Sequence, residues 1–137
     1  ATIKVGASSS IEMRERKERL DDALNATKAA LEEGIVVGGG LTYVKFAKQN
    51  SSSIPSWFYD ALFSPAETLL ENSGSSLEID EWDMHSNEGY NALTNQVENL
   101  YDAGVFDPVK VTKNSFLAAM SIASLFYSTD VAVLVEE

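Results

Sequence analysis

Residues 21–40 read DDALNATKAALEEGIVVGGG, and the rest of the chain is organised around this stretch. Leu24 and Leu31 lie at helical spacing, on one face of a long helix. Gly34 stands where a helix C-cap favours a left-handed residue. The three β-branched residues after it predict a short strand. The glycines at 38–40 predict a turn, or a backbone that approaches another group closely.

Upstream of this stretch the sequence predicts the beginning of the same helix. Ser9 and Glu12 have the spacing of a capping box. Opposite charges four residues apart over residues 12–21 support a solvated helix. Polar and apolar residues alternate over Thr2–Gly6, which predicts a short strand. This strand would need a partner strand from elsewhere.

Downstream, turn residues and apolar spacing divide the chain into further short elements. The predicted elements are a helix over 41–50, a helix from Pro55 through Leu62, a separate helix from Ser64 to Asn72 closed by Gly74, a short helix near 77–82, a hairpin within 88–105, a helix after the Asp107-Pro108 pair, and a terminal strand over 130–135. The helix after Pro108 has its apolar residues at helical spacing, so we expect it in the centre of the core. Those residues are Val111, Ser115, Ala118, Ala119, Ile122, Leu125 and Phe126.

Composition limits the classes of protein to which the chain can belong. Its 137 residues suit one domain, or one domain with an appendage, and 45% hydrophobic residues suffice for a core. A net charge of −11 argues against nucleic acid and against anionic membrane surfaces as partners. The chain has no cysteine, which fits a reducing compartment, and we expect a cytoplasmic protein. The first residues lack the pattern of a signal peptide.

Local motifs for chemistry are weak. The glycine triplet completes neither a phosphate loop nor a dinucleotide fingerprint. His85 is the single histidine and lies in an acidic segment, but the calcium-loop pattern there fails at Glu88 and Thr94. One histidine and no cysteine argue against a zinc site. A hydrolase triad could use only His85, and no G-x-S-x-G motif accompanies it. Taken alone, Asp22 is a solvated helix carboxylate.

Three separated segments nevertheless resemble one family, the group I chaperonins, which are GroEL-like folding machines. The segments are residues 12–40, Gly89–Ala92 and Gly104–Thr112, and they occur in the family's order. The resemblance implies a mainly α fold, an equatorial-domain-like helical bundle with small β elements. Residues 1–33 resemble the last segment of the intermediate domain, and residues 34–137 the C-terminal half of the equatorial ATP-binding domain.

The resemblance also implies roles for single residues, with ATP and magnesium as cofactors. Asp22 matches the aspartate that positions or activates the attacking water. Gly39 matches a glycine that packs on the nucleotide, and Asn91 and Ala92 match residues that contact the adenine. Asp107 matches the aspartate that binds the ribose hydroxyls. This chemistry is coherent, because a carboxylate accepts from both hydroxyls of a diol.

The family's Gly-Asp-Gly-Thr-Thr phosphate loop, its magnesium-binding aspartate and its substrate-binding apical domain have no counterpart in this sequence. We therefore expect a C-terminal fragment of an ATP-dependent, ring-forming chaperonin, whose partners would be other subunits, a co-chaperonin and unfolded proteins. Alone, the fragment is expected neither to bind nor to hydrolyse ATP appreciably, and to self-associate weakly through its first and last strands. The alternatives are a free-standing acidic helical interaction module and a divergent paralogue.

Overall fold

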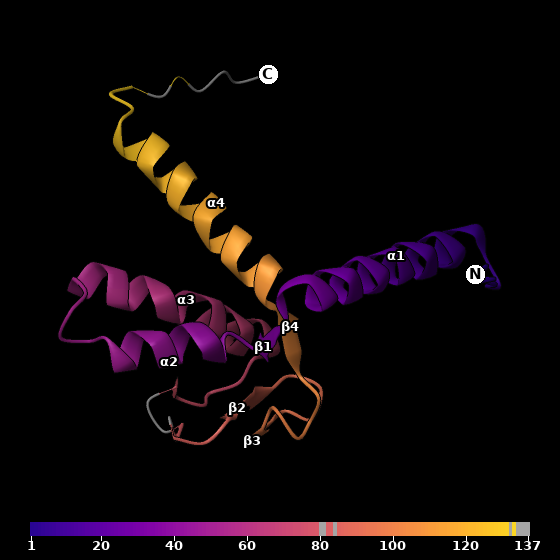
Figure 1. Ribbon diagram of the computed structural model, residues 1–137, viewed down its shortest axis with the longest axis horizontal. Helices are drawn as coiled ribbons and strands as arrows, with labels where there is room; N and C mark the ends of the chain where they lie inside the picture. Colours follow the sequence, from indigo (N-terminus) through magenta and orange to yellow (C-terminus); the bar gives the residue numbers. More distant parts are fainter. Residues whose placement is uncertain (80–81, 84, 132, 134–137) are drawn as a thin grey trace. The chain divides into compact units, whose positions relative to one another are not determined.

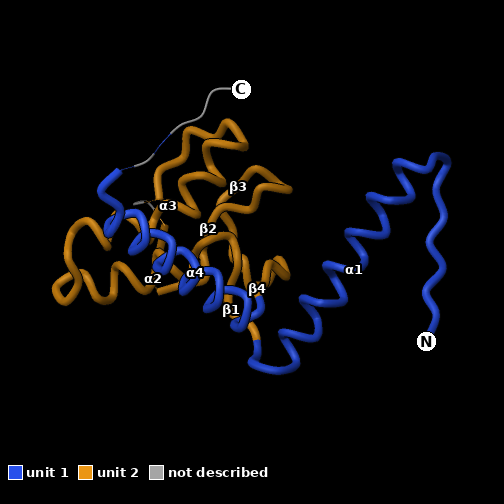
Figure 2. Tube along the Cα trace, turned by 90° about the horizontal axis from the view of Figure 1, so that it is seen from above, with its two compact units in different colours: residues 1–34, 108–137 blue, residues 35–107 orange. Residues whose placement is uncertain are grey.

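The computed structural model describes residues 1–79, 82–83, 85–131 and 133, and it is mainly helical, as the sequence predicts (Figure 1). Contacts divide the chain into unit 1, residues 1–34 and 108–137, and unit 2, residues 35–107 (Figure 2). The assignment to intermediate and equatorial domains stays a prediction. The elements are α1 (Ser10–Glu33), β1 (Ile35–Val37), α2 (Leu41–Gln49), α3 (Ser56–Ser73), β2 (Glu88–Asn91), β3 (Gln96–Asn99), β4 (Phe106–Pro108) and α4 (Val109–Tyr127).

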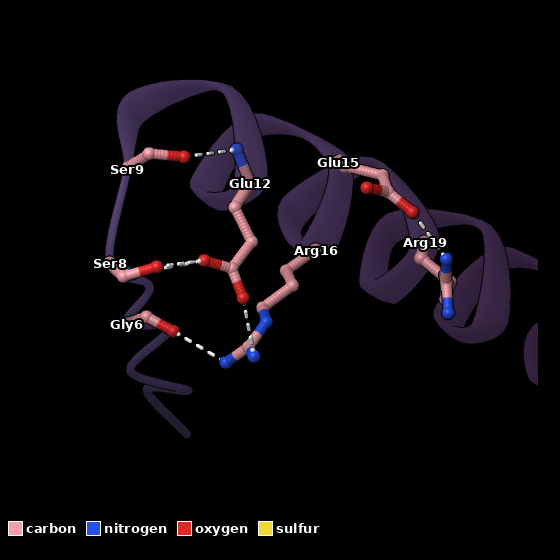
Figure 3. A network of polar contacts seen from close by, with 7 residues as sticks. All are labelled: Gly6, Ser8, Ser9, Glu12, Glu15, Arg16 and Arg19. Carbon is pink, nitrogen blue, oxygen red and sulfur yellow. Dashed lines mark hydrogen bonds and ion pairs between the residues drawn. The ribbon is translucent and has the colours of Figure 1, made fainter.

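Helix α1 begins at a capped N-terminus in unit 1 (Figure 3). The Ser9 hydroxyl accepts a hydrogen bond from the Glu12 amide at 3.2 Å, so the predicted N-cap is confirmed. The Glu12 carboxylate accepts from the hydroxyl of Ser8 at 2.6 Å and from its amide at 3.1 Å. These bonds, above all the one from the Ser8 hydroxyl, lower the pKa of Glu12. None of the residues of α1 is buried.

The strand predicted over Thr2–Gly6 is wrong, because residues 1–7 form no regular element. The Gly6 carbonyl accepts a hydrogen bond from the Arg16 guanidinium at 2.8 Å, within a network that also ties Arg16 to Glu12 (Figure 3). A strand needs backbone hydrogen bonds from a neighbouring strand. The Gly6 carbonyl instead bonds to the Arg16 side chain of α1.

Unit 2 has a core in which α2 packs on α3 (Figure 1). A β-carbon built on Gly40 would come to 2.9 Å from the backbone nitrogen of Ala66, so the two helices meet there at close range. The hairpin and the segment before it complete the core. The buried apolar residues are Leu41, Val44, Ala47, Leu62, Phe63, Ala66, Leu70, Ile79, Trp82, Tyr90 and Leu100.

One continuous helix, α3, replaces the two helices predicted over 55–62 and 64–72. Pro65 lies inside it and does not begin a second helix. A proline in a helix interior costs about 3 kcal/mol, but the residues around it bury a long apolar face against α2, and this packing outweighs the local preference. The predicted closing role of Gly74 is confirmed: its φ is +68°, and the amides of Gly74 and Ser75 donate to Glu71 and Leu70.

The predicted hairpin is confirmed as β2 and β3, which pair antiparallel with Tyr90 opposite Val97. Strand β1 pairs with β4 in a second two-stranded sheet. The short helix predicted near 77–82 falls partly on residues 80 and 81, outside the described residues; Ile79 and Trp82, which flank them, are buried.

Helix α4 departs most from the sequence prediction. It begins at Val109 with Pro108 as the N-cap, while Asp107 belongs to β4 and caps nothing. The expectation that α4 is central to the core is wrong, since none of its residues is buried. Helical spacing predicts an apolar face, but it does not say what covers that face. The Lys110 and Lys113 ammonium groups pair with Glu32 and Glu33 at the end of α1. Half of the residues of the strand predicted over 130–135 lie outside the described residues.

Candidate functional site

The glycine turn forms the centre of the candidate site, in unit 2. Gly38 is buried, and its amide donates to the Val105 carbonyl at 3.0 Å. Gly39 and Gly40 have φ values of +66° and +75°, which only glycine adopts without strain. Gly40 precedes α2, whose first residue, Leu41, donates its amide to the Gly38 carbonyl at 3.2 Å. The predicted succession of strand, glycine turn and helix is therefore confirmed.

The turn lies between two of the regions that the sequence singles out. A β-carbon on Gly38 would come to 3.3 Å from Cγ and Oδ1 of Asp107. A β-carbon on Gly39 would come to 3.5 Å from the carbonyl oxygen of Tyr90, the residue before Asn91. The structure thus brings Gly39, Asp107 and the end of β2 together around one backbone turn. No side chain larger than hydrogen fits there without displacing its neighbours.

Asp107 offers a carboxylate at the edge of this turn. The residue is exposed, yet its carboxyl group packs against Gly38, and this partial loss of water raises its pKa. An accessible acceptor that is incompletely hydrated suits a ligand with hydroxyl donors, because binding then removes little further water.

Tyr43 is a residue of this region that the sequence analysis missed. It lies in the first turn of α2, half-buried, and its amide donates to the Gly40 carbonyl at 3.1 Å. Burial raises the pKa of its phenol, and the negative charge of Asp107 raises it further, so the two side chains act on each other. The sequence signal for Tyr43 is that a tyrosine stands between Leu41 and Val44, two residues at the apolar spacing of the helix.

Asn91 and Ala92 lie at the turn of the hairpin. Asn91 is 9% exposed, and both ends of its amide are engaged locally: Nδ2 donates to Glu98 at 2.7 Å, and Oδ1 accepts from the Leu93 amide at 3.0 Å. Ala92 is exposed. The Asn91 side chain therefore holds the turn in shape, and a ligand at this end would meet the backbone and Ala92 first.

Asp22 is exposed in the middle of α1. Among the described residues its carboxylate has no hydrogen-bond or ion-pair partner. It belongs to unit 1, whereas Gly39, Asn91, Ala92 and Asp107 belong to unit 2. The structure therefore brings four of the five predicted site residues into one unit.

The described residues of the acidic segment around His85 offer no ligand set for a metal. Within the part of the chain that the structure describes, no group of three or more potential metal ligands occurs. The His85 amide donates to the Asp83 carboxylate at 2.9 Å, which makes a local turn. The described helices also include none that is long and apolar enough to cross a membrane.

Comparison with known proteins identifies the family. The sequence pattern of the TCP-1/cpn60 chaperonin family matches residues 1–136. This chain belongs to that family. Over 148 aligned residues, the chaperonin chain is 42% identical to the chloroplastic chaperonin GroEL of Cyanidium caldarium, covering 98% of this chain and 28% of that relative. The group I resemblance is thereby confirmed, and the chain spans little more than a quarter of the relative's length.

Solved structures show the same fold. The chaperonin chain superposes on chaperonin gp146 of bacteriophage EL 2 (Pseudomonas aeruginosa) with a TM-score of 0.76 at 21% identity, over 97% of this chain and 29% of gp146. A second crystal form gives a TM-score of 0.75 at 20% identity, over 98% and 29% of the two chains. Both crystals of gp146 were grown in the presence of ATP-BeFx.

Proposed function

We propose that this chaperonin chain supplies the nucleoside-binding part of an ATP site, and one residue for hydrolysis, to an ATP-dependent folding machine. The contact of Gly38 with the Asp107 carboxylate carries the proposal, because it puts a hydroxyl acceptor beside a backbone with no side chain. Family membership over residues 1–136 and the ATP analogue used with gp146 support it. They favour it over a free-standing acidic interaction module.

In this proposal each predicted residue has a distinct task. The Asp107 carboxylate accepts hydrogen bonds from the ribose hydroxyls, and Gly39 lets the nucleotide approach the turn. Asn91 shapes the hairpin end so that Ala92 and the backbone face the adenine. Asp22 on α1 orients the attacking water once α1 closes over the nucleotide. Bound ATP supplies the phosphoanhydride bond whose hydrolysis drives the cycle.

The family's Gly-Asp-Gly-Thr-Thr phosphate loop does not occur in this sequence, which covers 28% of its chloroplastic relative. We therefore propose that other parts of a longer chaperonin chain supply the contacts to the phosphates and magnesium. By itself the 137-residue chain is expected to show no micromolar affinity for ATP with magnesium in calorimetry. Saturable micromolar binding that is lost in Asp107→Ala would mean that the nucleoside contacts suffice.

The whole protein is proposed to act as a ring of identical subunits that captures and releases non-native proteins with a co-chaperonin. Its net charge of −11 disfavours nucleic acid in the same role. Family membership supports the ring assembly and an interaction with substrate proteins, and we propose that an apical domain binds them.

A hybrid chaperonin tests the roles of Asp22 and Asp107. The chain would replace the matching segment of the Cyanidium caldarium relative, and ATP hydrolysis would be measured. Asp22→Ala should lower kcat by about 100-fold or more, as the loss of a water-orienting base does, with little effect on nucleotide affinity. Asp107→Ala should weaken ATP binding by about 10-fold or more, since it removes hydrogen bonds to a charged group.

The neighbouring carboxylate provides the matched control. Asp21→Ala removes the same charge one residue away and should leave both kcat and affinity near the wild-type values. Equal losses in Asp21→Ala and Asp22→Ala would show a general effect of charge on α1 and would contradict the assignment of Asp22. An Asp22→Ala hybrid with normal turnover would do the same.

A further inference from the structure

The carboxylate of Glu98 reaches from β3 to the turn of the hairpin. Its Oε1 atom accepts a hydrogen bond from Nδ2 of Asn91 at 2.7 Å and another from the Thr94 hydroxyl at 2.8 Å. Glu98 lies opposite Gly89 in the hairpin, so Asn91, two residues further along β2, is its diagonal neighbour on the same face. Because Gly89 places no side chain on that face, the long Glu98 side chain has room to lean toward the turn.

The Glu98 carboxylate determines how the Asn91 amide is oriented. A carboxylate only accepts hydrogen bonds, so the NH2 end of the Asn91 amide must face it. The other end, Oδ1, is then in place to accept from the Leu93 amide at 3.0 Å. Glu98 is the only charged residue among residues 89–98, and hydrogen bonds to a charged group are stronger than those between neutral groups.

Further hydrogen bonds complete the turn around Ala92. The Asn95 amide donates to the Asn91 carbonyl at 2.8 Å, and the Tyr90 hydroxyl donates to Oδ1 of Asn95 at 2.6 Å. Asn95 has a φ of +57°, a left-handed conformation that asparagine tolerates better than most residues. Ala92 is exposed within this frame. The turn therefore has a defined shape without a ligand, and Glu98 ties it to β3.

We propose that Glu98 is a positioning residue of the nucleoside site, which holds the turn at residues 91–94 in the shape that receives the base. The inference rests on the proposed function, in which Ala92 and the backbone of the turn face the adenine. A turn that is already ordered loses less conformational freedom when a ligand binds, so affinity rises. Glu98 acts through Asn91 and Thr94, and the proposal requires no contact between Glu98 and the nucleotide.

The hydrogen bond between Glu98 and Asn91 is tested first, without a ligand. In ¹⁵N spectra of the 137-residue chain, Glu98→Ala should shift the side-chain NH2 signals of Asn91 toward those of a solvated asparagine. Glu88→Ala is the matched control, because it removes an exposed carboxylate from the first residue of β2. It should leave the Asn91 signals in place. Asn91 signals that are the same in wild-type protein and Glu98→Ala would overturn the inference.

Adenosine at millimolar concentration then tests the role in binding. Shifts of the amide signals of residues 38–40 and 92 give the dissociation constant. Glu98→Ala should weaken adenosine binding by about 3- to 10-fold, the value of one ordinary hydrogen bond. Glu98→Gln should stay within about 2-fold of wild type, because its amide oxygen still accepts from Asn91 and Thr94. Glu88→Ala should also stay within about 2-fold.

The conservative variant separates hydrogen bonding from charge. If Glu98→Gln loses as much affinity as Glu98→Ala, the negative charge and not the hydrogen bonds supports binding, and the inference is overturned. A loss in Glu88→Ala equal to that in Glu98→Ala would overturn it for the same reason.

Asp107→Ala separates the inference from the proposed function. If Asp107→Ala weakens adenosine binding and Glu98→Ala does not, the Glu98 inference is overturned and the nucleoside site stands. If adenosine shifts none of the site amides in the wild-type chain, both the inference and the nucleoside role of this chain are contradicted.

Discussion

Gly38 lies against the carboxyl group of Asp107, and a β-carbon on Gly38 would come to 3.3 Å from Cγ and Oδ1 of Asp107. This packing raises the pKa of Asp107, because water is partly removed from the carboxylate. The folded chain then holds the Asp107 proton more tightly than the unfolded chain does. The stabilising effect is complete below the unfolded value of 3.8 and is lost as the pH rises through the folded pKa.

We therefore expect Asp107→Asn to stabilise the chain at neutral pH and to have no such effect near pH 3. The gain should stay below about 1 kcal/mol, because solvent still reaches Asp107 and screens the effect. Urea unfolding at the two pH values, followed by fluorescence of the buried Trp82, measures it. Asp102→Asn, an exposed carboxylate five residues earlier, is the control. A gain for Asp107→Asn that is the same at both pH values would contradict the electrostatic explanation.

Gly40 and Gly104 share a φ of +75° but differ in their surroundings. A β-carbon at Gly40 would overlap the backbone of Ala66 at 2.9 Å, whereas at Gly104 it meets nothing within 4 Å. Gly104→Ala should cost about 1–2 kcal/mol of unfolding free energy, the strain of a left-handed alanine. Gly40→Ala should cost about 2–4 kcal/mol, since α2 and α3 must also move apart. Equal losses in urea unfolding would mean that α2 and α3 do not meet as closely as described.

Pro65 interrupts the hydrogen bonding of α3 in the middle of the helix while its own ring is exposed. Pro65→Ala restores an amide donor, so we expect the free energy of unfolding to rise by about 1–3 kcal/mol. Pro55→Ala serves as the control, because Pro55 precedes the helix and blocks no interior bond; its effect should be within about 0.5 kcal/mol. A loss of stability in Pro65→Ala would show that α3 depends on the proline, for example to bend around α2.

The sequence predicts the elements whose signals are local. The Ser9 cap, the glycine turn at 38–40, the hairpin from Tyr90 and the end of α3 at Gly74 each depend on a few adjacent residues, and the structure confirms them. The candidate site has another source. The family resemblance, and not a local signal, points to Gly39 and Asp107, and both lie at one turn.

The failures come from interactions between distant residues. Pro65 carries a strong local signal for a helix start, but the packing of Leu62 and Phe63 on α2 overrides it. Tyr43 has no motif, and only burial and the charge of Asp107, which both raise the pKa of its phenol, distinguish it from other tyrosines. The apolar spacing of α4 is real, yet spacing carries no information about whether a covering surface lies within the same sequence.

Helix α4 exposes a row of large apolar side chains, among them Leu125 at 66% and Phe126 at 74% exposure. The chain covers 28% of its chloroplastic relative, so the surface that would cover α4 can lie in the remainder of a longer protein. Self-association of the isolated chain is therefore expected through α4. The strand edge predicted for this role at the N-terminus does not form. Large exposed apolar patches drive such association.

Sedimentation velocity over a range of concentrations should show association in the wild-type chain at high micromolar concentration. Leu125→Glu should weaken it by about 10- to 100-fold, which corresponds to the loss of one buried leucine side chain. Ser124→Glu adds the same charge to the same helix, about 100° around the axis from Leu125, and it should weaken association far less. If both variants reduce association equally, net charge and not the apolar face controls it. A wild-type chain that stays monomeric at every concentration would show that exposed α4 is tolerated in solution.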